Sequence, residues 1–472
     1  MIKIADGMGL SRREALRSLG NGFGMVGLAS TLGEALLHSQ STQPLRGPLE
    51  PKTPLLPARA KHVIFLFLNG GVSQVDTFDP KPLLDKYNGK PAPGGNLKTT
   101  SKTGNLMRSP FGFKTYGESG IQVSDIFPSV GGCIDEFCVI RSLYSDGSDH
   151  TPGLLMMNCG HLQVGRPSMG SWITYGLGTE NQNLPGFVVL CPGMPILGPP
   201  LWSSGFLPAI YQATYIANKE TDPLKLIADI HNTRLSLPEQ RRQLDLIAQL
   251  NNMHLEARGQ EPQLEARIQA MEIAYHMQTE APDVFDIRKE SEATRQRYGD
   301  GDFAHGCLMA LRLIEHGVRA VEVYYGDKQP WDSHQDILEH RTHALKCDRP
   351  IAALIQDLKA RGLFHETLVV VGSEFGRTPA VQMGNGLSNG RDHNPYGFTM
   401  LLAGGGVKGG TVYGATDDFG VKAIENPVHV HDLHATILYL LGLDHEKLTY
   451  RYSGRDFRLT DVSGKVIKEI IA

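Results

Sequence analysis

The sequence predicts an α/β fold in which a mostly parallel central sheet carries helices on both faces. Several short segments are continuously apolar rather than alternating, which is typical of strands covered on both faces. Segments with the helical spacing of apolar residues separate them, which gives a repeated β-α-β order. The length of 472 residues, with 41% hydrophobic and 20% charged residues, allows one large domain with insertions or two domains.

The first half of the chain provides three strand candidates. Residues 63–68 form a continuous apolar run that ends at Asn69 and two glycines. Residues 136–144 ("EFCVIRSLY") and 184–191 ("LPGFVVLC") are the second and third candidates. Each run is bounded by polar or turn-forming residues, as expected for strands in the middle of a sheet.

Residues 222–318 change character and predict a helical insertion, which serves as a lid or as a packing layer. Its segments show helical spacing with charged outer faces. The last of them, "FAHGCLMALRLIEHG", is closed by Gly317 and leads into the strand "VRAVEVYYG". A helix at 348–362 and a strand at 367–373 follow. The β-α-β order then continues through "GFTMLLAGGG" (397–406) and the helix "DLHATILYLLG" (432–442).

Polar side chains stand at the ends of these strands, where the ligand crevice of a parallel sheet lies. Acidic and imidazole groups from five segments are therefore expected to converge on one edge. The candidates are Asn69 after the first strand, His150 with Ser148 and Asp149 after the second, Asp332, His334 and Asp336, Glu374, and Asp392 with His393.

A mixture of histidine nitrogen and carboxylate oxygen suits zinc, manganese or iron better than calcium. Each residue alone has an ordinary interpretation as well. Asp332 and His334 fit a solvated turn, and Asp392-His393 follows the turn-forming pair Asn389-Gly390. Their joint placement at successive strand ends favours a metal site. Arg377 either meets an anionic substrate or pairs with Glu374, and the sequence leaves both open.

Five motifs stand out along the chain: "NGGVSQVDTFDPKP", "RPSMGSWITYGLGTENQNLPGFVVL", "WDSHQD", "SEFGRTP" and "GRDHNPYGF". Together they resemble the DUF1501 family, which is related to the alkaline phosphatase and sulfatase superfamily. The resemblance covers about residues 60–460. In addition, "VHVHDLHATILYLLGL" is similar to the helix that follows the last strand in sulfatases. The resemblance implies an alkaline phosphatase/sulfatase-like fold.

The superfamily binds one or two metals and attacks a phosphate or sulfate ester, so the resemblance also implies site residues. The metal ligands carried over are Asp332, His334, Glu374 and His393, with Asn69 where the first strand normally offers an aspartate. Asp332 and His334 resemble the Asp-x-x-x-His metal pair of the superfamily with altered spacing, and Asp336 falls where the histidine of that pair would stand. Phe375 stands where the superfamily has a further histidine.

The nucleophile is less clear. In the sulfatases that the chain resembles, the nucleophile stands about nine residues before a Thr-Gly that closes its helix, and Cys159-Gly160 resembles that closure. Counting back by this spacing reaches His150, which is then a metal ligand, an attacking imidazole or a histidine at a helix start. Thr151 beside it is a hydroxyl nucleophile candidate at a helix N-terminus. Arg377 would stabilise charge on the leaving oxygens.

These residues predict a metal-dependent hydrolase of phosphate or sulfate esters, with zinc or manganese as the cofactor. Its substrate would be a small anionic ester or a sulfated or phosphorylated polymer. The alternative is a non-catalytic exported binding protein with a degenerate site, and a purely structural metal is a third possibility. The formal charge of −4 gives no general attraction to nucleic acid.

The N-terminus resembles a twin-arginine export signal. Arg12-Arg13 precede a moderately apolar, glycine-rich segment, and the alternative is an amphipathic helix that docks on the body. The predicted organisation is a signal at 1–39, a Pro-rich linker at 40–60 and one α/β domain at 61–472. We therefore expect export through the twin-arginine machinery to the periplasm or cell envelope. No other run approaches the length of a membrane span.

Overall fold

The computed structural model of the chain describes residues 47–93, 97, 99, 101–227, 230–258, 262–383 and 389–472. Pro48–Ala472 form one compact unit. The predicted export signal at 1–39 and the linker as far as residue 46 lie outside the described residues. Within the described part of the chain, no helix is both long enough and apolar enough to cross a bilayer.

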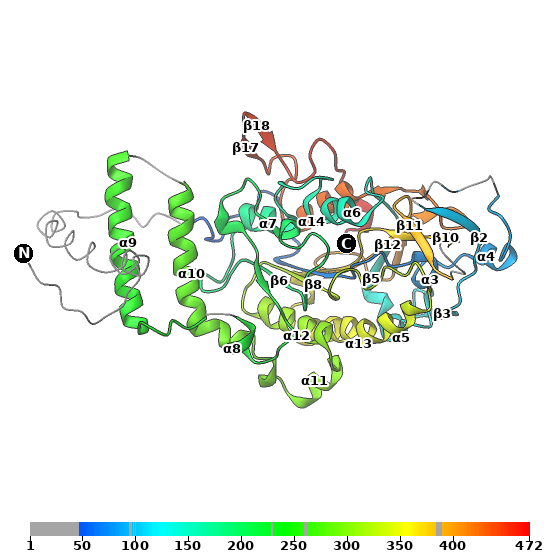
Figure 1. Cartoon of the computed structure of the whole chain (residues 1–472), viewed down its shortest axis with the longest axis horizontal. Helices are drawn as coiled ribbons and strands as arrows, with labels where there is room; N and C mark the ends of the chain where they lie inside the picture. The colour runs from blue at the N-terminus through cyan, green and yellow to red at the C-terminus, as the bar shows by residue number, and fades with distance from the viewer. Residues whose placement is uncertain are drawn as a thin grey trace, which may run out of the picture. The chain divides into compact units, whose positions relative to one another are not determined.

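A nine-stranded sheet forms the middle of the compact unit (Figure 1). Across the sheet the strands are β13 (Thr411–Tyr413), β5 (Phe137–Tyr144), β12 (Phe398–Gly404), β9 (Thr367–Gly372), β1 (His62–Phe67), β8 (Ala320–Tyr324), β6 (Phe187–Leu190) and β7 (Thr214–Ile216), with β16 (Val428–His429) beside β5. All pairs are parallel except the two made by β12. The predicted mostly parallel α/β fold is confirmed.

β12 does not continue the β-α-β order that the sequence suggested. Between β9 and β12 the described residues contain no crossover helix and instead form β10 (Gly376–Met383) and β11 (Arg391–Asn394). These two pair antiparallel in a small sheet with β2 (Lys102–Leu106). A parallel return would need a crossover connection. The chain therefore re-enters the main sheet at the edge where β9 left it, and β12 runs antiparallel to both neighbours.

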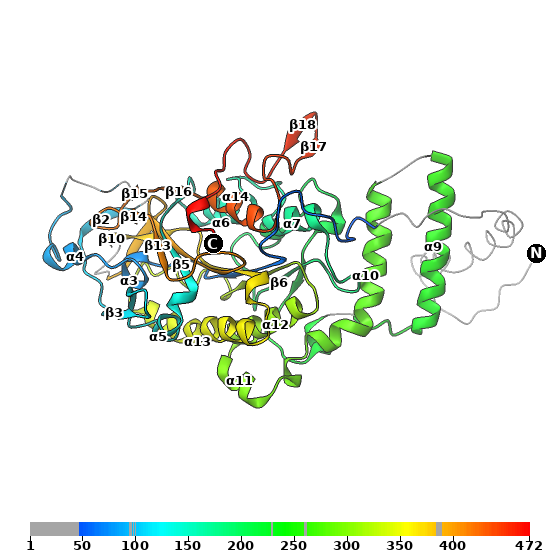
Figure 2. The same cartoon turned by 180° about the vertical axis from the view of Figure 1, so that it is seen from behind.

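Helices cover both faces of the sheet, as predicted. One face carries α12 (Asp302–Glu315), α13 (Glu339–Ala360) and α5 (Pro128–Gly132), and the other carries α6 (His150–Cys159), α7 (Met169–Leu177) and α14 (Val430–Leu440) (Figures 1 and 2). In β1, Ile64 and Leu66 join the core on the first face, and Val63, Phe65 and Phe67 join the core on the second. The two-sided burial explains why the strand is continuously apolar.

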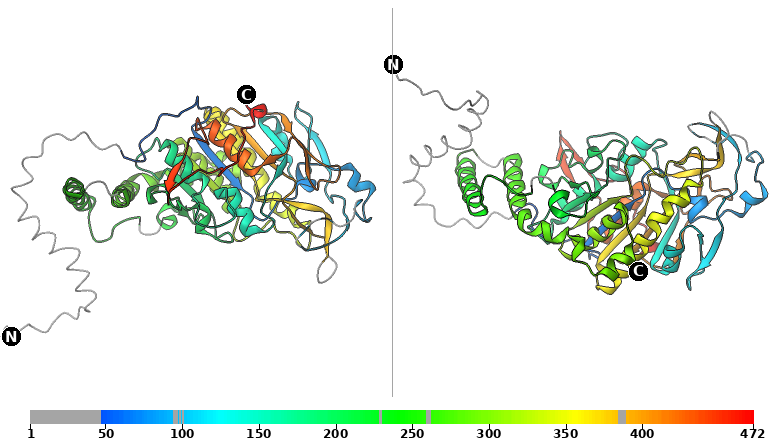
Figure 3. Two further views of the ribbon diagram at one scale, coloured as in Figure 1. Left: turned by 90° about the horizontal axis from the view of Figure 1, so that it is seen from above. Right: turned by 60° about the horizontal axis from the view of Figure 1, so that its bottom comes forward.

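Most of the described residues in the segment 222–318 are helical, and its role as an insertion stays a prediction. The helices are α8 (Pro223–Leu226), α9 (Leu237–Arg258), α10 (Pro262–Val284), the short η6 (Ile287–Lys289), α11 (Glu292–Tyr298) and α12. α12 packs on α13 and β8 and forms part of the layer below the sheet. α9 lies beside α10, and α10 contacts α8, α12 and η5 (Ala209–Tyr211) (Figure 3).

Smaller elements complete the unit. They are α3 (Gln74–Thr77), α4 (Pro82–Lys86), β3 (Phe113–Tyr116), β4 (Ile121–Ser124), η3 (Ile134–Glu136), η4 (Pro199–Trp202), η7 (Phe364–Glu366), β14 (Ala415–Thr416), β15 (Ala423–Glu425), β17 (Tyr450–Tyr452), β18 (Arg455–Phe457) and η8 (Lys468–Ile470). All six cysteines, which include the neighbours Cys133 and Cys138, are free thiols.

Candidate metal centre

One edge of the main sheet collects the predicted polar residues because the parallel strands all end there. His150 begins α6 just after β5, and Asp332 and His334 lie in the loop after β8. Glu374 directly follows β9. His393 reaches the same edge because β12 is antiparallel, so the residues before β12 stand where the parallel strands end.

Three imidazoles meet one carboxylate oxygen at this edge. Asp332 Oδ1 lies 3.1 Å from His150 Nε2, 2.8 Å from His334 Nε2 and 3.3 Å from His393 Nε2. The Nε2 atoms of His334 and His393 are 3.0 Å apart. One ligand atom from each of the four residues lies within 4.8 Å of all the others. We call these four residues the His-Asp cluster.

The other ring nitrogen of each histidine faces an acceptor. His150 Nδ1 lies 2.7 Å from Glu374 Oε1, His393 Nδ1 lies 3.2 Å from the carbonyl oxygen of Ser148, and His334 Nδ1 bonds to the amide oxygen of Gln382. Because an acceptor needs a proton from its partner, we assign the ring proton to Nδ1 in all three imidazoles. The three Nε2 lone pairs then point into the cluster.

This arrangement fits a bound divalent cation. Lone pairs on three nitrogens and an ionised carboxylate repel one another at about 3 Å unless a positive charge lies among them. The Nε2 atom of His150 is buried and makes no well-directed hydrogen bond. Three nitrogens and one oxygen form a donor set suited to zinc, manganese or iron. Acceptors behind the ligating histidines are the usual means of fixing their orientation.

The pKa shifts show which groups carry charge. Burial alone would raise the pKa of Asp332, but without a cation the three imidazoles can be protonated at Nε2 and donate to it, and these hydrogen bonds together with Arg377 hold the pKa of Asp332 far below its usual range. Burial likewise opposes ionisation of Glu374, yet His150 keeps the pKa of that carboxyl below its ordinary value. Burial would lower the pKa of His150, but Asp332 and Glu374 outweigh it and raise the pKa. Both carboxylates are therefore ionised at neutral pH.

Glu374 lies behind the cluster rather than in it. Its carboxylate is fully buried and accepts hydrogen bonds from the Gly70 backbone N–H at 3.1 and 3.2 Å. The Ser373 hydroxyl donates to it at 2.7 Å, and His150 Nδ1 completes its partners. Glu374 was expected among the metal ligands, but His150 takes that place in the cluster. Glu374 instead orients the His150 ring through its hydrogen bond with Nδ1.

Arg377 is sealed inside the same region. Its side chain is fully buried, with Nε donating to the Gly71 carbonyl at 2.8 Å and Nη2 lying 2.5 Å from Asp332 Oδ1. The same guanidinium also bonds to the carbonyls of Gly70, Trp331 and Arg391. It pairs with Asp332 and not with Glu374, and it is not accessible to a substrate as the sequence prediction required.

Asn69 and Thr151 stand outside the cluster. The Asn69 amide donates to the carbonyls of Gly326 and Lys328 at 3.0 and 2.6 Å, so it holds the loop that leads to Asp332. A polar residue at this strand end therefore supports the site without facing the cation position. Thr151 is exposed in the first turn of α6.

Asp336 and Asp392 also serve the loops around the cluster. Asp336 Oδ1 accepts the Leu338 N–H at 3.0 Å. Asp392 is fully buried and accepts the backbone N–H groups of Ser101 and His393, each at 2.8 Å. Sequence reasoning missed Gln382, because a glutamine inside β10 carries no signal of a role at the site.

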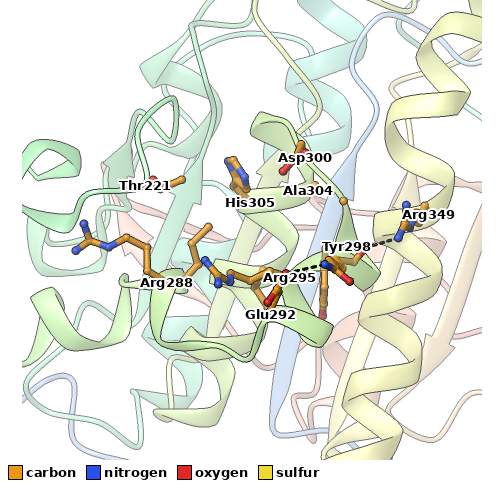
Figure 4. A pocket seen from close by; sticks show the side chains of 13 residues that line it. Thr221, Arg288, Glu292, Arg295, Tyr298, Asp300, Ala304, His305 and Arg349 are labelled. Atoms are coloured by element: carbon orange, nitrogen blue, oxygen red, sulfur yellow. Dashed lines mark hydrogen bonds between the residues drawn. The ribbon is translucent and has the colours of Figure 1, made fainter.

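A cavity of about 590 Å³ lies elsewhere, between α11 and α12 (Figure 4). Arg288, Arg295 and Arg349 line it, but Arg288 is paired with Asp286 at 2.6 Å. Arg349 donates to the backbone carbonyls of Arg297 and Gln296 at the end of α11. None of the cluster residues lines this cavity, so it is separate from the candidate metal centre.

The fold and this centre define an α/β protein with a partly buried His-Asp cluster at the carboxyl edge of its sheet. The model of the family "Protein of unknown function (DUF1501)" matches residues 60–471. The chain therefore belongs to the DUF1501 family, as its motifs predicted. No curated protein matches the chain.

Solved structures with some similarity include sulfatases and related hydrolases. The PsFucS1 sulfatase from Pseudoalteromonas sp. is 11% identical, covers 93% of this chain and 73% of its own, and has a TM-score of 0.34. The phosphonate monoester hydrolase SpPMH from Silicibacter pomeroyi is 12% identical over 67% of this chain and 68% of its own, with a TM-score of 0.30. The TAB5 alkaline phosphatase is 14% identical, covers 75% of this chain and 92% of its own, and has a TM-score of 0.29.

Proposed function

We propose that this protein is a metal-dependent hydrolase of phosphate or sulfate esters. The observation that supports this is the convergence of three Nε2 lone pairs on one oxygen of Asp332, with an acceptor behind every imidazole. Such a preorganised site is costly to build for stability alone, because buried polar groups that face one another are destabilising without a cation.

A zinc or manganese ion held here would supply Lewis acidity for an ester oxygen and lower the pKa of a bound water. The chain's own residues perform the supporting work. Asp332 brings the negative charge that a cation needs, and Arg377 fixes the position of that carboxylate. Glu374 retains the Nδ1 proton of His150, so the Nε2 lone pair stays directed at the cation.

One observation favours the second candidate, a non-catalytic exported binding protein. The Phe375 ring lies 4.9 Å from the His150 ring and 4.5 Å from the His393 ring, measured between centroids. An apolar ring therefore occupies the place where the superfamily resemblance implies a further metal-binding histidine. This leaves room for one cation rather than two, and a single cation serves binding as well as hydrolysis.

The test begins with elemental analysis of the purified protein. We expect about one zinc or manganese per chain, which His150→Ala reduces and the exposed surface variant His365→Ala leaves unchanged. Glu374→Gln should fold and weaken metal binding roughly 10- to 100-fold, because its amide cannot replace all acceptor contacts of the carboxylate.

The metal-loaded protein is then assayed with aryl phosphates and aryl sulfates. Turnover that disappears in His150→Ala supports the hydrolase. One bound metal without turnover of any ester supports the binding protein instead. A protein that binds no metal, and whose stability does not change when a chelator is added, contradicts both the hydrolase and the metal-binding protein.

We also propose export through the twin-arginine machinery to the periplasm or cell envelope, with an anionic ester or a sulfated or phosphorylated polymer as the substrate. The Arg12-Arg13 pair and the apolar segment after it support this proposal. A reporter fused behind residues 1–39 should be exported, and changing both arginines to lysine should retain it in the cytoplasm. Export that persists in the double variant contradicts the proposal.

A further inference from the structure

We propose that the cavity between α11 and α12 binds a small zwitterion with an aliphatic side chain, which is the chemistry of a free amino acid or a short peptide. The carboxylate of the ligand pairs with Arg295, and its ammonium group pairs with Asp300. This binding site is independent of the candidate metal centre, because no residue of the His-Asp cluster lines the cavity.

The cavity has a buried, mostly apolar floor and an exposed, charged rim. Its volume of about 590 Å³ is in the range of small-molecule binding sites. The side chains of the floor are at most 3% exposed, and they are Ile287, Tyr298, Ala304 and Leu308. The charged side chains of the rim are all exposed, and they are Arg288, Glu292, Arg295, Asp300 and Arg349 (Figure 4). A ligand with an aliphatic body can therefore bury apolar surface here while its charged groups meet the rim.

Three of the five charged rim side chains already have partners within the protein. Arg288 pairs with Asp286 at 2.6 Å. Glu292 lies in the first turn of α11, where a negative charge is favourable, and it accepts a hydrogen bond from the Gln296 amide at 2.9 Å. Arg349 donates to main-chain carbonyls in the last turn of α11, which lack partners within the helix. These contacts hold α11 in place and occupy the three charged groups.

Arg295 and Asp300 are the two charged rim residues that remain. Within the part of the chain that the structure describes, neither side chain makes a hydrogen bond or an ion pair, with the other or with any neighbour. A guanidinium without a partner binds a carboxylate through two parallel N–H donors. A carboxylate without a partner accepts hydrogen bonds from an ammonium group. One cation and one anion at the rim therefore match a ligand that carries one charge of each sign.

The charges around the cavity favour neither a simple anion nor a simple cation. Three arginines and two carboxylates line it, and Asp286, which pairs with Arg288, offsets the one positive charge in excess. Asp222 adds a further carboxylate 3.7 Å from Arg288. No excess of positive charge therefore remains to attract a simple anion, and the unpaired Arg295 repels a simple cation.

His305 contributes a neutral hydrogen-bonding group to the cavity. Burial lowers the pKa of its imidazole, and the nearby Asp302 and Asp300 oppose this effect only in part. The ring is therefore neutral at neutral pH and adds no charge. Its buried Nδ1 atom has no hydrogen-bond partner, so a polar group of the ligand can satisfy it.

Isothermal titration calorimetry on the full chain at pH 7 tests the proposal. The two zwitterionic probes are leucine and leucyl-leucine. Each is compared with its N-acetyl derivative, which lacks the ammonium group, and with its C-terminal amide, which lacks the carboxylate. We expect at least one zwitterion to bind, and we expect both of its derivatives to bind at least about 10-fold more weakly, because each loses one charge-assisted contact. The relative affinity of leucine and leucyl-leucine identifies the free amino acid or the peptide as the ligand.

Two variants assign the charged groups to the two ends of the ligand. Arg295→Gln should weaken binding of the zwitterion about 10-fold but not weaken binding of its amide, which has no carboxylate to lose. Asp300→Asn should weaken binding of the zwitterion but not of its N-acetyl derivative, which has no ammonium group. Both side chains are exposed and have no partners, so both variants should fold. Arg242→Gln is the control, because this exposed arginine on α9 does not line the cavity, and it should change no affinity.

Three results would overturn the proposal. In the first, neither leucine nor leucyl-leucine binds. In the second, an N-acetyl derivative or an amide binds as tightly as its parent, because a single charge then accounts for the affinity. In the third, the zwitterion binds equally well to Arg295→Gln and Asp300→Asn, which places the ligand elsewhere. None of these results concerns metal uptake by the His-Asp cluster, so the proposed function is tested separately.

Discussion

Glu322 in the middle of the sheet provides the sharpest prediction of pH-dependent stability. It lies on β8 between Phe65 of β1 and Val189 of β6. Its side chain is 2% exposed, and neither carboxylate oxygen has a hydrogen-bond partner. Burial raises the pKa of Glu322 from 4.5 to about 8. The folded protein therefore holds a proton here that the unfolded chain releases at neutral pH.

The magnitude follows from this shift. A carboxyl group whose pKa is raised on folding stabilises the fold fully below its unfolded pKa, and this contribution is lost as the pH rises to the folded pKa. The shift from 4.5 to about 8 corresponds to about 5 kcal/mol at 1.36 kcal/mol per pH unit, as an upper limit. Glu322→Gln removes the titrating group and keeps the shape of the side chain.

Urea unfolding between pH 5 and pH 9 measures the effect. The free energy of unfolding of the wild type should fall relative to that of Glu322→Gln as the pH rises, by several kcal/mol over this range. Glu446→Gln, at an exposed carboxylate, controls for the loss of one acidic group. A difference between wild type and Glu322→Gln that stays constant across the pH range would refute the reasoning.

Two further predictions concern the loops around the candidate metal centre. Asp76→Asn breaks a fully buried ion pair in which Arg391 Nε lies 2.7 Å from Asp76 Oδ2, and it should cost about 3–5 kcal/mol in denaturant unfolding because an uncompensated buried charge remains; a loss below 1 kcal/mol would contradict this. Gly70→Ala should lower both stability and metal affinity, because φ is +123° and a Cβ atom would lie 2.7 Å from the backbone nitrogen of Asp332. Gly454 also has a positive φ, of +83°, but open space around the added Cβ atom, so Gly454→Ala should lower stability somewhat and leave metal affinity unchanged. Equal metal affinity in the two glycine variants would show that the close approach at Gly70 does not position the cluster.

The strands were predictable because each is a short apolar run that both helix layers cover. Residues 63–68 and 367–373 became β1 and β9 with shifts of one residue at their ends. β12 was also found in the sequence, but its direction was not. Direction depends on the connection, and the β10–β11 hairpin returns the chain to the edge that it left.

The cluster was predicted in part. Asp332, His334 and His393 were expected together and lie together. His150 was left open between three roles, and it joins the cluster where Glu374 had been expected. Position at a strand end is visible in a sequence, whereas the direction of a side chain depends on its partners. Glu374 turns toward the Gly70 N–H and the His150 ring, and these contacts arise between residues far apart in the chain.

The sequence by itself determined the sheet-forming runs, the polar strand ends and the set of nitrogen and oxygen donors, because these follow from local composition and spacing. Only the tertiary structure decided which donor atoms face a common point, and which charged side chains are buried or exposed. Arg377 illustrates the reason. Four carbonyl oxygens and one carboxylate oxygen, from three segments far apart in the chain, surround its guanidinium. A charge so completely satisfied by its neighbours is held inside the protein and out of a substrate's reach.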